Sequence, residues 1–417
     1  MSADTDLSVD WNAPPPDDGP NYLQAVTDMA ERCQVVAHSA IYNANGIKLV
    51  EQGARIDARL YDRLVQHRLQ GSIDGHLSAE NAVDIAAIQA LARQRCQEPL
   101  LQRMAQAVGG EAALLAPLAA VPLPAPLAFK LTVMREQQPA LLAHSVGVML
   151  VALYLGLRTG LAQAEASHLA AAALLHDIGV LHMDPVWRDP SHKVAGPGRK
   201  HLVAHPVTAM LLVRAQPAYP PAVAQAVLEH HERLDGTGYP RGTPGADISP
   251  LGHILLLAEV VDAFFGKYRD HPAQRLSLML RLNHRKFPPA LVALVLPLLA
   301  DESTAGADAP TMQAEAERHA AVLAQTFERW IQLRAPLVGK LPAPGAFIDQ
   351  RLGALHKALI AAGAHPHQLS DMLPLLQGDA QGLAELGRGR VGGVARPRAV
   401  VFLYQRAVEA QWTGHGK

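Results

Sequence analysis

Apolar residues follow helical spacing over most of this chain. Between residues 131 and 300 they recur with the periodicity of helices, and segments rich in Pro and Gly near 184–200 and 235–250 interrupt them. Alanine and leucine dominate, and runs of β-branched residues are short. Because alanine and leucine are strong helix formers, the pattern predicts a mainly α protein with a helical bundle over 131–300.

The N-terminal part has a different pattern. Residues 1–20 include the acidic, proline-rich run Pro14-Pro15-Pro16-Asp17-Asp18 and predict a disordered arm. Within residues 40–50, Asn45-Gly46 separates two apolar runs. These two residues accept the positive φ angles of a tight turn, so a β-hairpin is predicted. Residues 21–130 are therefore expected to hold a small α/β regulatory unit and a linker.

Further boundaries follow from helical spacing and from the residues that interrupt it. Helices are expected over 57–70 and 80–107, and a linker over the proline-rich segment 109–127. A second linker is expected over 301–312. The whole of 301–417 is predicted to be a helical C-terminal extension of unknown role, with helices near 313–334, 347–362 and 398–412. Its arginines could dock the extension on the helical bundle, mediate self-association or line a solvated basic loop; they are Arg388, Arg390, Arg396 and Arg398.

Composition excludes several classes of protein. The length of 417 residues favours two or three domains, and the 49% of hydrophobic residues allow a sizeable core. The formal net charge of -1 argues against a broad surface for nucleic acid or anionic membrane. Aromatic residues make up only 5%, which weakens the case for a base-stacking platform. No nucleic-acid polymer is therefore expected as a partner.

The location is predicted from the cysteines and the apolar segments. Cys33 and Cys96 are too few for a disulfide framework, which suits a reducing compartment. The N-terminus does not resemble a signal peptide. Prolines break the apolar stretch 112–129, so it cannot form a regular membrane helix. We expect a soluble cytoplasmic protein that does not enter a membrane.

Histidines and aspartates within 131–300 form the strongest chemical signal of the chain. The pair His176-Asp177 follows an apolar run and should lie near a buried helix end. Asp262 lies in a helix that is apolar almost all round, where an unpaired charge is costly and a metal ion would stabilise it. Imidazole and carboxylate together are typical of hydrolytic two-metal centres. The candidate metal ligands are His144, His176, Asp177, His205, His230, His231 and Asp262.

Each candidate also has a structural explanation. A single histidine is more often packed or solvated than a ligand, and Asp262 could be the buried partner of an arginine. Neighbours on a helix point about 100° apart. His230 and His231 should therefore bind different ions, or one ion and the substrate, unless the helix ends there. The ordered set with two adjacent pairs favours a metal site.

With these motifs the chain resembles the HD-GYP family, the cyclic di-GMP phosphodiesterase branch of the bacterial HD metal-dependent phosphohydrolases. The resemblance covers 131–300 and rests on two motifs, His176-Asp177-Ile178-Gly179 and His230-His231-Glu232-x-x-Asp235-Gly236-x-Gly238-Tyr239-Pro240. It implies an HD-type helical bundle in which the seven candidates hold two divalent ions. His176 and Asp177 would be the catalytic pair, with Asp177 bridging the ions. Iron or manganese is favoured, and nickel or zinc would also suit these ligands.

The same resemblance suggests substrate contacts. Gly238 and Tyr239 would belong to a loop beside the site. Lys267 and Arg269 offer charges that could grip a phosphate or a guanine, although a charged surface loop explains them equally well.

Two positions depart from the family pattern. Val180 follows His176-Asp177-Ile178-Gly179 where the family usually has a lysine. Valine cannot stabilise the charge that develops on a reacting phosphate, which predicts reduced activity. Ala140 stands where family members with three metals carry a glutamate, so two ions are expected.

Two main functions follow from these motifs and their departures. The first is a cytoplasmic phosphodiesterase that hydrolyses cyclic di-GMP to pGpG, GMP or both in second-messenger signalling. The second is a catalytically weak protein that senses cyclic di-GMP or binds a signalling partner. A phosphohydrolase for another nucleotide is a third alternative. A homodimer is compatible with each of them.

Overall fold

The computed structural model describes residues 13–188, 199–268, 271–283 and 285–300, together with scattered positions between 318 and 353. The chain forms two compact units. The first comprises Met1–Ala263 and Lys286–Leu291, and the second comprises Phe264–Arg285 and Val292–Lys417. All seven candidate metal ligands belong to the first unit.

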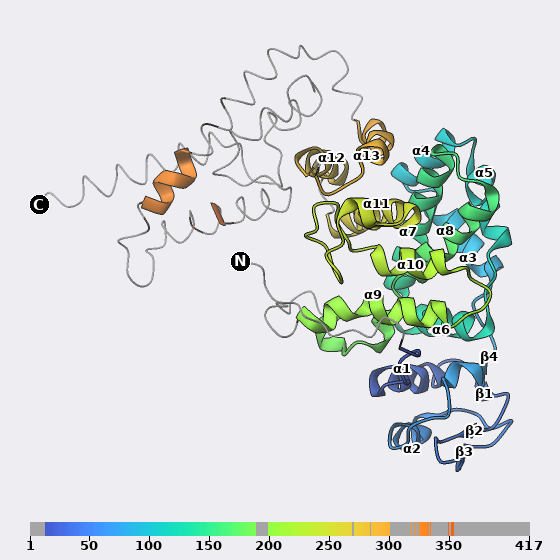
Figure 1. The fold of residues 1–417 in the computed structure, drawn as a ribbon. Helices are drawn as coiled ribbons and strands as arrows, with labels where there is room; N and C mark the ends of the chain where they lie inside the picture. The colour runs from blue at the N-terminus through green and yellow to red at the C-terminus, as the bar shows by residue number, and fades with distance from the viewer. Residues whose placement is uncertain are drawn as a thin grey trace, which may run out of the picture. The chain divides into compact units, whose positions relative to one another are not determined.

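Short strands and helices build the N-terminal part of the first unit (Figure 1). Strand β1 pairs antiparallel with β4, and β2 pairs antiparallel with β3. This arrangement confirms the predicted small α/β unit. Its elements are α1 (Pro20–Ala30), β1 (Val35–Ala37), β2 (Ile41–Tyr42), β3 (Lys48–Val50), η1 (Ala58–Leu60), α2 (Tyr61–Val65), η2 (Ile73–Gly75) and β4 (Leu77–Ala79).

The predicted hairpin is confirmed between β2 and β3. Gly46 adopts a φ of 77°, a left-handed conformation that favours glycine. The side-chain oxygen of Asn43 accepts hydrogen bonds from the backbone nitrogens of Asn45 at 3.0 Å and Ile47 at 2.8 Å. The side chain of Asn43 and the backbone of Gly46 therefore fix the turn.

The predicted arm differs from the structure where the structure describes it. Residues 1–12 lie outside the described part of the chain, but Asp17 and Asp18 make specific contacts. Arg68 Nε lies 3.0 Å from Asp17 Oδ2, and the Ile73 nitrogen donates to Asp18 Oδ2 at 2.5 Å. The expectation of disorder is therefore wrong for these two aspartates, because Arg68 and the start of η2 supply donors for them.

Three predicted segments have other boundaries in the structure. The helix expected over 57–70 is limited to η1 and α2, because Leu69 forms a bridge with Asn43. The helix expected over 80–107 is two helices, α3 (Ile85–Arg95) and α4 (Pro99–Ala107). They separate because Pro99 disfavours the helical conformation of the residue before it, Glu98. The expected linker 109–127 contains α5 (Glu111–Leu115) and η3 (Ala116–Ala120), which pack against α7 and α8 respectively.

A bundle of helices forms the rest of the first unit (Figure 1). Helix α7 packs against α6 and α8, α10 packs against α8 and α9, and α9 packs against η4. This confirms the expected helical bundle. Its elements are α6 (Ala125–Gln137), α7 (Pro139–Arg158), α8 (Gln163–Leu175), η4 (Ile178–His182), η5 (Pro185–Arg188), α9 (Arg199–Arg214), α10 (Pro221–Glu229), η7 (Gly245–Asp247) and α11 (Pro250–Lys267).

Helix α7 is the central apolar element. It is the one described helix that is long and apolar enough to cross a membrane, but 72% of its most apolar window is buried inside the protein. It packs against α3, α6 and α8, as a core helix does. Its apolar surface is therefore explained by packing within the first unit.

The second unit is described mainly over its first helices, α12 (Pro272–Leu282), the end of α13 (Pro289–Val295) and η8 (Leu296–Leu299). Helix α12 packs against η8. The predicted linker 301–312 lies outside the described residues, as do Arg388, Arg390, Arg396 and Arg398. The helices expected near 313–334 and 347–362 are described only at scattered positions, and the one near 398–412 not at all.

Candidate metal centre

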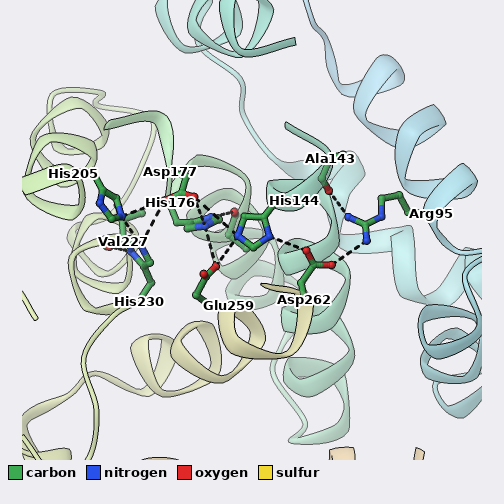
Figure 2. A network of polar contacts seen from close by, with 11 residues as sticks. Arg95, Ala143, His144, His176, Asp177, His205, Val227, His230, Glu259 and Asp262 are labelled. Carbon is green, nitrogen blue, oxygen red and sulfur yellow. Dashed lines mark hydrogen bonds and ion pairs between the residues drawn. The ribbon is translucent and has the colours of Figure 1, made fainter. Parts of the chain in front are cut away.

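Seven imidazole and carboxylate side chains converge inside the helical bundle, and they fall into two groups. The first group contains His144, His176 and Glu259, and the second contains Asp177, His205, His230 and His231. Within each group one ligand atom from every residue lies within 4.8 Å of the others. Figure 2 shows most of these side chains pointing toward one another from different helices. Each group is large enough to hold a metal ion.

Helix ends position most of these ligands. His176 is the C-cap of α8, and Asp177 precedes η4 directly. His230 is the C-cap of α10, and His231 follows it. His144 and Glu259 instead project from the bodies of α7 and α11.

Asp177 lies between the two groups. Its Oδ2 atom is 3.3 Å from His176 Nε2 and 4.0 Å from His144 Nε2. Its Oδ1 atom is 3.3 Å from His205 Nε2 and 3.7 Å from His230 Nε2. One carboxylate oxygen therefore faces each group, which is the geometry of a bridging ligand.

Three histidines are oriented by backbone carbonyls that their helices leave free. The Nδ1 atom of His176 donates to Ala173 O at 2.7 Å, and that of His230 donates to Val227 O at 2.6 Å. These carbonyls lie in the last turn of α8 and α10, where the helix provides no further N–H. Each Nε2 atom is thereby left with a lone pair that points into the site.

His205 obtains the same orientation inside a helix. Its Nδ1 donates to Leu202 O at 2.5 Å. The residue four positions after Leu202 is Pro206, which has no N–H, so this carbonyl has no intrahelical partner. The His205-Pro206 dipeptide therefore frees the acceptor that orients the histidine.

The arrangement of donors fits cations. The Nε2 atoms of His205 and His230 lie 3.3 Å apart, although both Nδ1 protons are committed to carbonyls. Two lone pairs at this distance repel unless a cation lies between them. Within the described chain, His176 Nε2 and Asp177 Oδ1 are buried polar atoms with no hydrogen-bond partner. Nitrogen and carboxylate oxygen ligands suit divalent transition metals.

The pKa values of these side chains point to the same conclusion. Burial opposes the charge on His144 and His176, but neighbouring carboxylates raise the pKa of His144 to about 11 and that of His176 to about 10. Burial also opposes ionisation of Asp177 and Glu259, yet the facing histidines hold the pKa of both well below the usual range. Protons on these histidines occupy the places that metal ions would take, so metal binding releases protons.

Two histidines of the second group, His230 and His231, are held neutral. Burial, reinforced by His176, lowers the pKa of His230 to about 3. Burial and the neighbouring His230 likewise lower the pKa of His231 well below its usual range. Neutral imidazole is the form that binds a metal ion.

Glu259 is missing from the ligands predicted on sequence, and Asp262 does not join either group. Glu259 Oε2 lies 2.8 Å from His144 Nε2 and 3.2 Å from His176 Nε2. Asp262 instead accepts from His144 Nδ1 at 2.7 Å and from Arg95 Nη2 at 3.0 Å. The two acids are three residues apart on one helix face, and both lie in an apolar helix. The cost of burying a charge, which selects Asp262, therefore applies equally to Glu259.

For His230 and His231 the structure shows the exception that the sequence left open, a helix that ends at this point. Both belong to the group that contains Asp177 and His205. Helix α10 ends at Glu229, so the 100° separation of neighbouring helical residues no longer applies. The two rings lie 4.1 Å apart between centroids.

The loop after these histidines is held by a buried carboxylate. Glu232 is fully buried and accepts hydrogen bonds from the nitrogens of Arg241 at 2.8 Å and Thr243 at 2.9 Å. Gly238 packs so closely on the backbone of Glu232 and Arg233 that a Cβ atom would overlap it. Gly238 is therefore explained by close packing, and its predicted contact with substrate stays a prediction.

Tyr239 lies beside His231, and its predicted contact with substrate stays a prediction. Its ring lies 4.6 Å from that of His231, and its nitrogen donates to His231 O at 3.1 Å. A cavity of about 290 Å³ opens here, lined by Asp177, Val180, Met183, Leu202, His205, His231 and Tyr239. The described lining residues include no lysine or arginine. Val180 therefore lies beside the metal ligands, where the sequence predicts a loss of positive charge.

The other predicted substrate contacts are not placed at the centre. Lys267 ends α11 and belongs to the second compact unit, where its Nζ lies 5.3 Å from the centroid of the Tyr268 ring. Arg269 lies outside the described residues. The roles of both residues stay predictions.

Comparison with known proteins agrees with this geometry. Residues 95–290 match the family model of the HD domain. This match supports the resemblance to the HD-GYP family that the two motifs carry. The matched segment begins earlier than the predicted boundary at 131, so it includes the last residue of α3.

Several curated relatives share part of this segment. A 3'3'-cGAMP-specific phosphodiesterase of Vibrio cholerae is 31% identical over 176 residues, which cover 40% of this chain and 38% of the relative. A cyclic di-GMP phosphodiesterase of Pseudomonas aeruginosa is 32% identical over 121 residues, 29% of each chain. A cyclic di-GMP phosphodiesterase response regulator of Xanthomonas campestris is 35% identical over 106 residues, 25% of this chain and 28% of the relative. The matches thus span well under half of these relatives.

A solved structure of an HDG"Y"P protein from Bdellovibrio bacteriovorus also aligns with this chain. It is 17% identical and covers 64% of this chain and 94% of the solved one, with a TM-score of 0.35.

Proposed function

We propose that this protein is a two-metal phosphodiesterase that hydrolyses a 3',3'-cyclic dinucleotide, with cyclic di-GMP as the expected substrate and pGpG, GMP or both as products. The observation that carries the proposal is Asp177, whose two oxygens face two separate groups of ligands. Curated relatives named as phosphodiesterases of cyclic di-GMP and 3'3'-cGAMP support the substrate class.

The proposed ligand set differs at one position from the prediction made on sequence alone. His144, His176 and Glu259 would hold one ion, His205, His230 and His231 the other, and Asp177 would bridge them. Two bound cations supply charge that polarises a phosphodiester oxygen and lowers the pKa of a water molecule. Iron or manganese is proposed, because both accept mixed nitrogen and oxygen ligands.

The residues of the chain itself would orient the reactants. Asp177 and the three carbonyl-bound histidines would hold the two ions at defined positions. Tyr239 forms one side of the cavity next to His231 and would contact the substrate there. Catalysis by positioning requires this kind of rigid support, since small displacements of reacting groups are costly.

The test is turnover by the full chain loaded with manganese or iron. Cyclic di-GMP and 3'3'-cGAMP are supplied separately, and linear products are followed by chromatography. We expect hydrolysis by the native chain and none by Asp177→Ala, because this change removes the bridging ligand. Hydrolysis retained in Asp177→Ala would exclude the two-metal mechanism. Hydrolysis of 3'3'-cGAMP without hydrolysis of cyclic di-GMP would show that cyclic di-GMP is not the substrate.

One observation favours a second function, that of a cyclic dinucleotide sensor. Val180, Met183 and Leu202 form an apolar wall of the cavity beside the ligands. Such a wall provides no charge for the transition state, so the site is compatible with binding without efficient turnover. Calorimetric binding of cyclic di-GMP by the metal-loaded chain without product formation would support the sensor.

The remaining assignments extend this proposal. An HD-GYP domain over 131–300, a regulatory unit over 21–130 and substrate contacts by Lys267 and Arg269 are proposed on sequence alone. A cytoplasmic location is proposed because the only described helix that is long and apolar enough to cross a membrane is mostly buried in the bundle. A homodimer or a signalling partner is compatible with these assignments.

A further inference from the structure

His144 is oriented differently from three other histidines of the site. His176, His205 and His230 each donate from Nδ1 to a carbonyl of their own helix. His144 lies inside α7, where the carbonyls accept the helix's own hydrogen bonds. Its Nδ1 donates instead to Asp262 Oδ2 on α11 at 2.7 Å. The orientation of this ring therefore depends on a side chain from another helix.

Asp262 is in turn held by Arg95, the last residue of α3. Arg95 Nη2 donates to Asp262 Oδ1 at 3.0 Å, and Arg95 Nη1 donates to Ala143 O at 2.5 Å (Figure 2). On its other side Arg95 Nε donates to Glu98 Oε1 at 2.7 Å. The guanidinium thus contacts the residue directly before His144 as well as the acceptor of His144. A planar group with five donors suits this double contact.

Gly147 provides the space for this pair of charges. It lies one turn after His144 on α7, and a Cβ atom at this position would overlap Asp262 Oδ1 and Arg95 Nη1. The side chains of Arg95 and Asp262 are only 13% and 7% exposed, so neither can move into solvent without breaking the ion pair. A side chain at this position would therefore push the ion pair away from its present place.

We propose that Arg95, Asp262 and Gly147 form a positioning device that fixes the ring of His144 with Nε2 directed toward Glu259 and His176. Through it, α3 sets the metal affinity of the first ligand group, while the second group, oriented by its own helices, is independent of α3. The inference rests on the metal centre of the proposed function, but not on its substrate. Outer partners of this kind typically change metal affinity by about 10- to 100-fold.

The test measures manganese binding without substrate. The native chain and Arg95→Gln are stripped of metal and titrated with manganese, and free ion is followed by electron paramagnetic resonance. We expect two sites in the native chain. In Arg95→Gln one site should keep its affinity, and the other should weaken by about 10- to 100-fold. Arg93→Gln is the matched control, since Arg93 is 57% exposed on the same helix.

Two further variants separate positioning from general damage to the fold. Gly147→Ala leaves every charge in place but displaces the ion pair, so it should weaken the same single site. Arg95→Lys keeps the charge without the double contact and should fall between Arg95→Gln and the native chain. Thermal unfolding of the proteins without metal shows which variants are folded. If Arg95→Gln is not folded, the manganese affinity of Gly147→Ala tests the inference instead.

The outcomes distinguish this inference from the proposed function. Unchanged affinity at both sites in Arg95→Gln and Gly147→Ala would overturn the inference, and equal weakening of both sites would overturn the independence of the second group. A native chain that binds fewer than two manganese ions would overturn the metal centre itself. Two-site binding with the expected loss, but without hydrolysis of a dinucleotide, would support the inference and count against the phosphodiesterase.

Discussion

Two clusters of buried polar side chains lie in the first unit, and they solve the problem of buried charge differently. In the Lys130 cluster, formed by Lys130, Tyr22, Asp74, His182 and Asp18, the cation lies 2.7 Å from Asp74 Oδ2 and 3.3 Å from His182 Nε2. It also lies 3.7 Å from the centroid of the Tyr22 ring. The metal centre instead has acceptor atoms that face one another. Buried charge alone does not mark a functional site, whereas buried acceptors that face one another require an explanation such as a bound cation.

The protonation of the two histidine environments shows the same contrast. Burial, with Lys130 adding to it, lowers the pKa of His182 well below its usual range, so this imidazole is neutral and accepts from the lysine. At the metal centre burial also opposes charge, but the carboxylates win and raise the pKa of His176 to about 10. In the Lys130 cluster the lysine itself neutralises the buried carboxylate. In the metal centre, protons or metal ions must do so.

The largest effect on metal binding is expected when each of the two acids of α11 is neutralised in a separate variant. Glu259→Gln removes a proposed ligand, so manganese binding at the first group and hydrolysis should fall by more than the roughly 100-fold that outer partners reach. Asp262→Asn should stay within about 10- to 100-fold, because it only orients His144. Manganese titration and turnover of both variants check this. A larger loss in Asp262→Asn would restore Asp262 as the ligand that the sequence predicted.

The next effect tests whether the Lys130 cluster is structural. Lys130 is 2% exposed, and Lys130→Met would leave Asp74 as an uncompensated buried charge. We expect a loss of about 3–5 kcal/mol in the free energy of unfolding, measured with urea, and unchanged manganese binding by the folded protein.

The double variant Lys130→Met with Asp74→Asn is the control for this prediction. It removes both charges, so much of the lost stability should return. The opposite result would be a Lys130→Met variant that keeps the native free energy of unfolding but loses a manganese site. The Lys130 cluster would then serve the metal centre, and the two regions would not differ in role.

The sequence identified the chemistry of the site better than its geometry. The candidates selected around His176-Asp177 and His230-His231 include six of the seven converging side chains, because ligand residues must be histidine or carboxylate whatever the fold. The choice between Glu259 and Asp262 depended on the rotation of α11, and the shared site of His230 and His231 depended on the last residue of α10. Neither is visible in residue types alone.

The fold was predicted with a similar limit. Helical spacing identified the bundle and Asn45-Gly46 identified the hairpin, because both signals are local. The proline-rich segment 109–127 was expected to be a linker, although α5 and η3 bury Leu114 and Leu118 there. Prolines also begin helices, at the positions where a helix needs no N–H donor. Burial of leucines against α7 and α8 is a tertiary effect that spacing does not reveal.

The smallest effect concerns Asp18, at the edge of the Lys130 cluster, where the free energy of unfolding should depend on pH. Burial and the neighbouring Asp74 raise the pKa of Asp18 from 3.8 to about 6. Because the folded pKa is the higher one, the contribution of Asp18 to stability is present below pH 3.8 and is lost as the pH rises through about 6. Asp18→Asn should therefore gain up to about 2 kcal/mol relative to the native chain between about pH 4 and pH 7, measured by urea unfolding. Asp17→Asn is the matched control, because it makes the same substitution at the neighbouring position in a side chain that is 61% exposed. A native chain and Asp18→Asn whose stabilities run parallel over this range would show that Asp18 titrates normally, and that the cluster ends at Asp74.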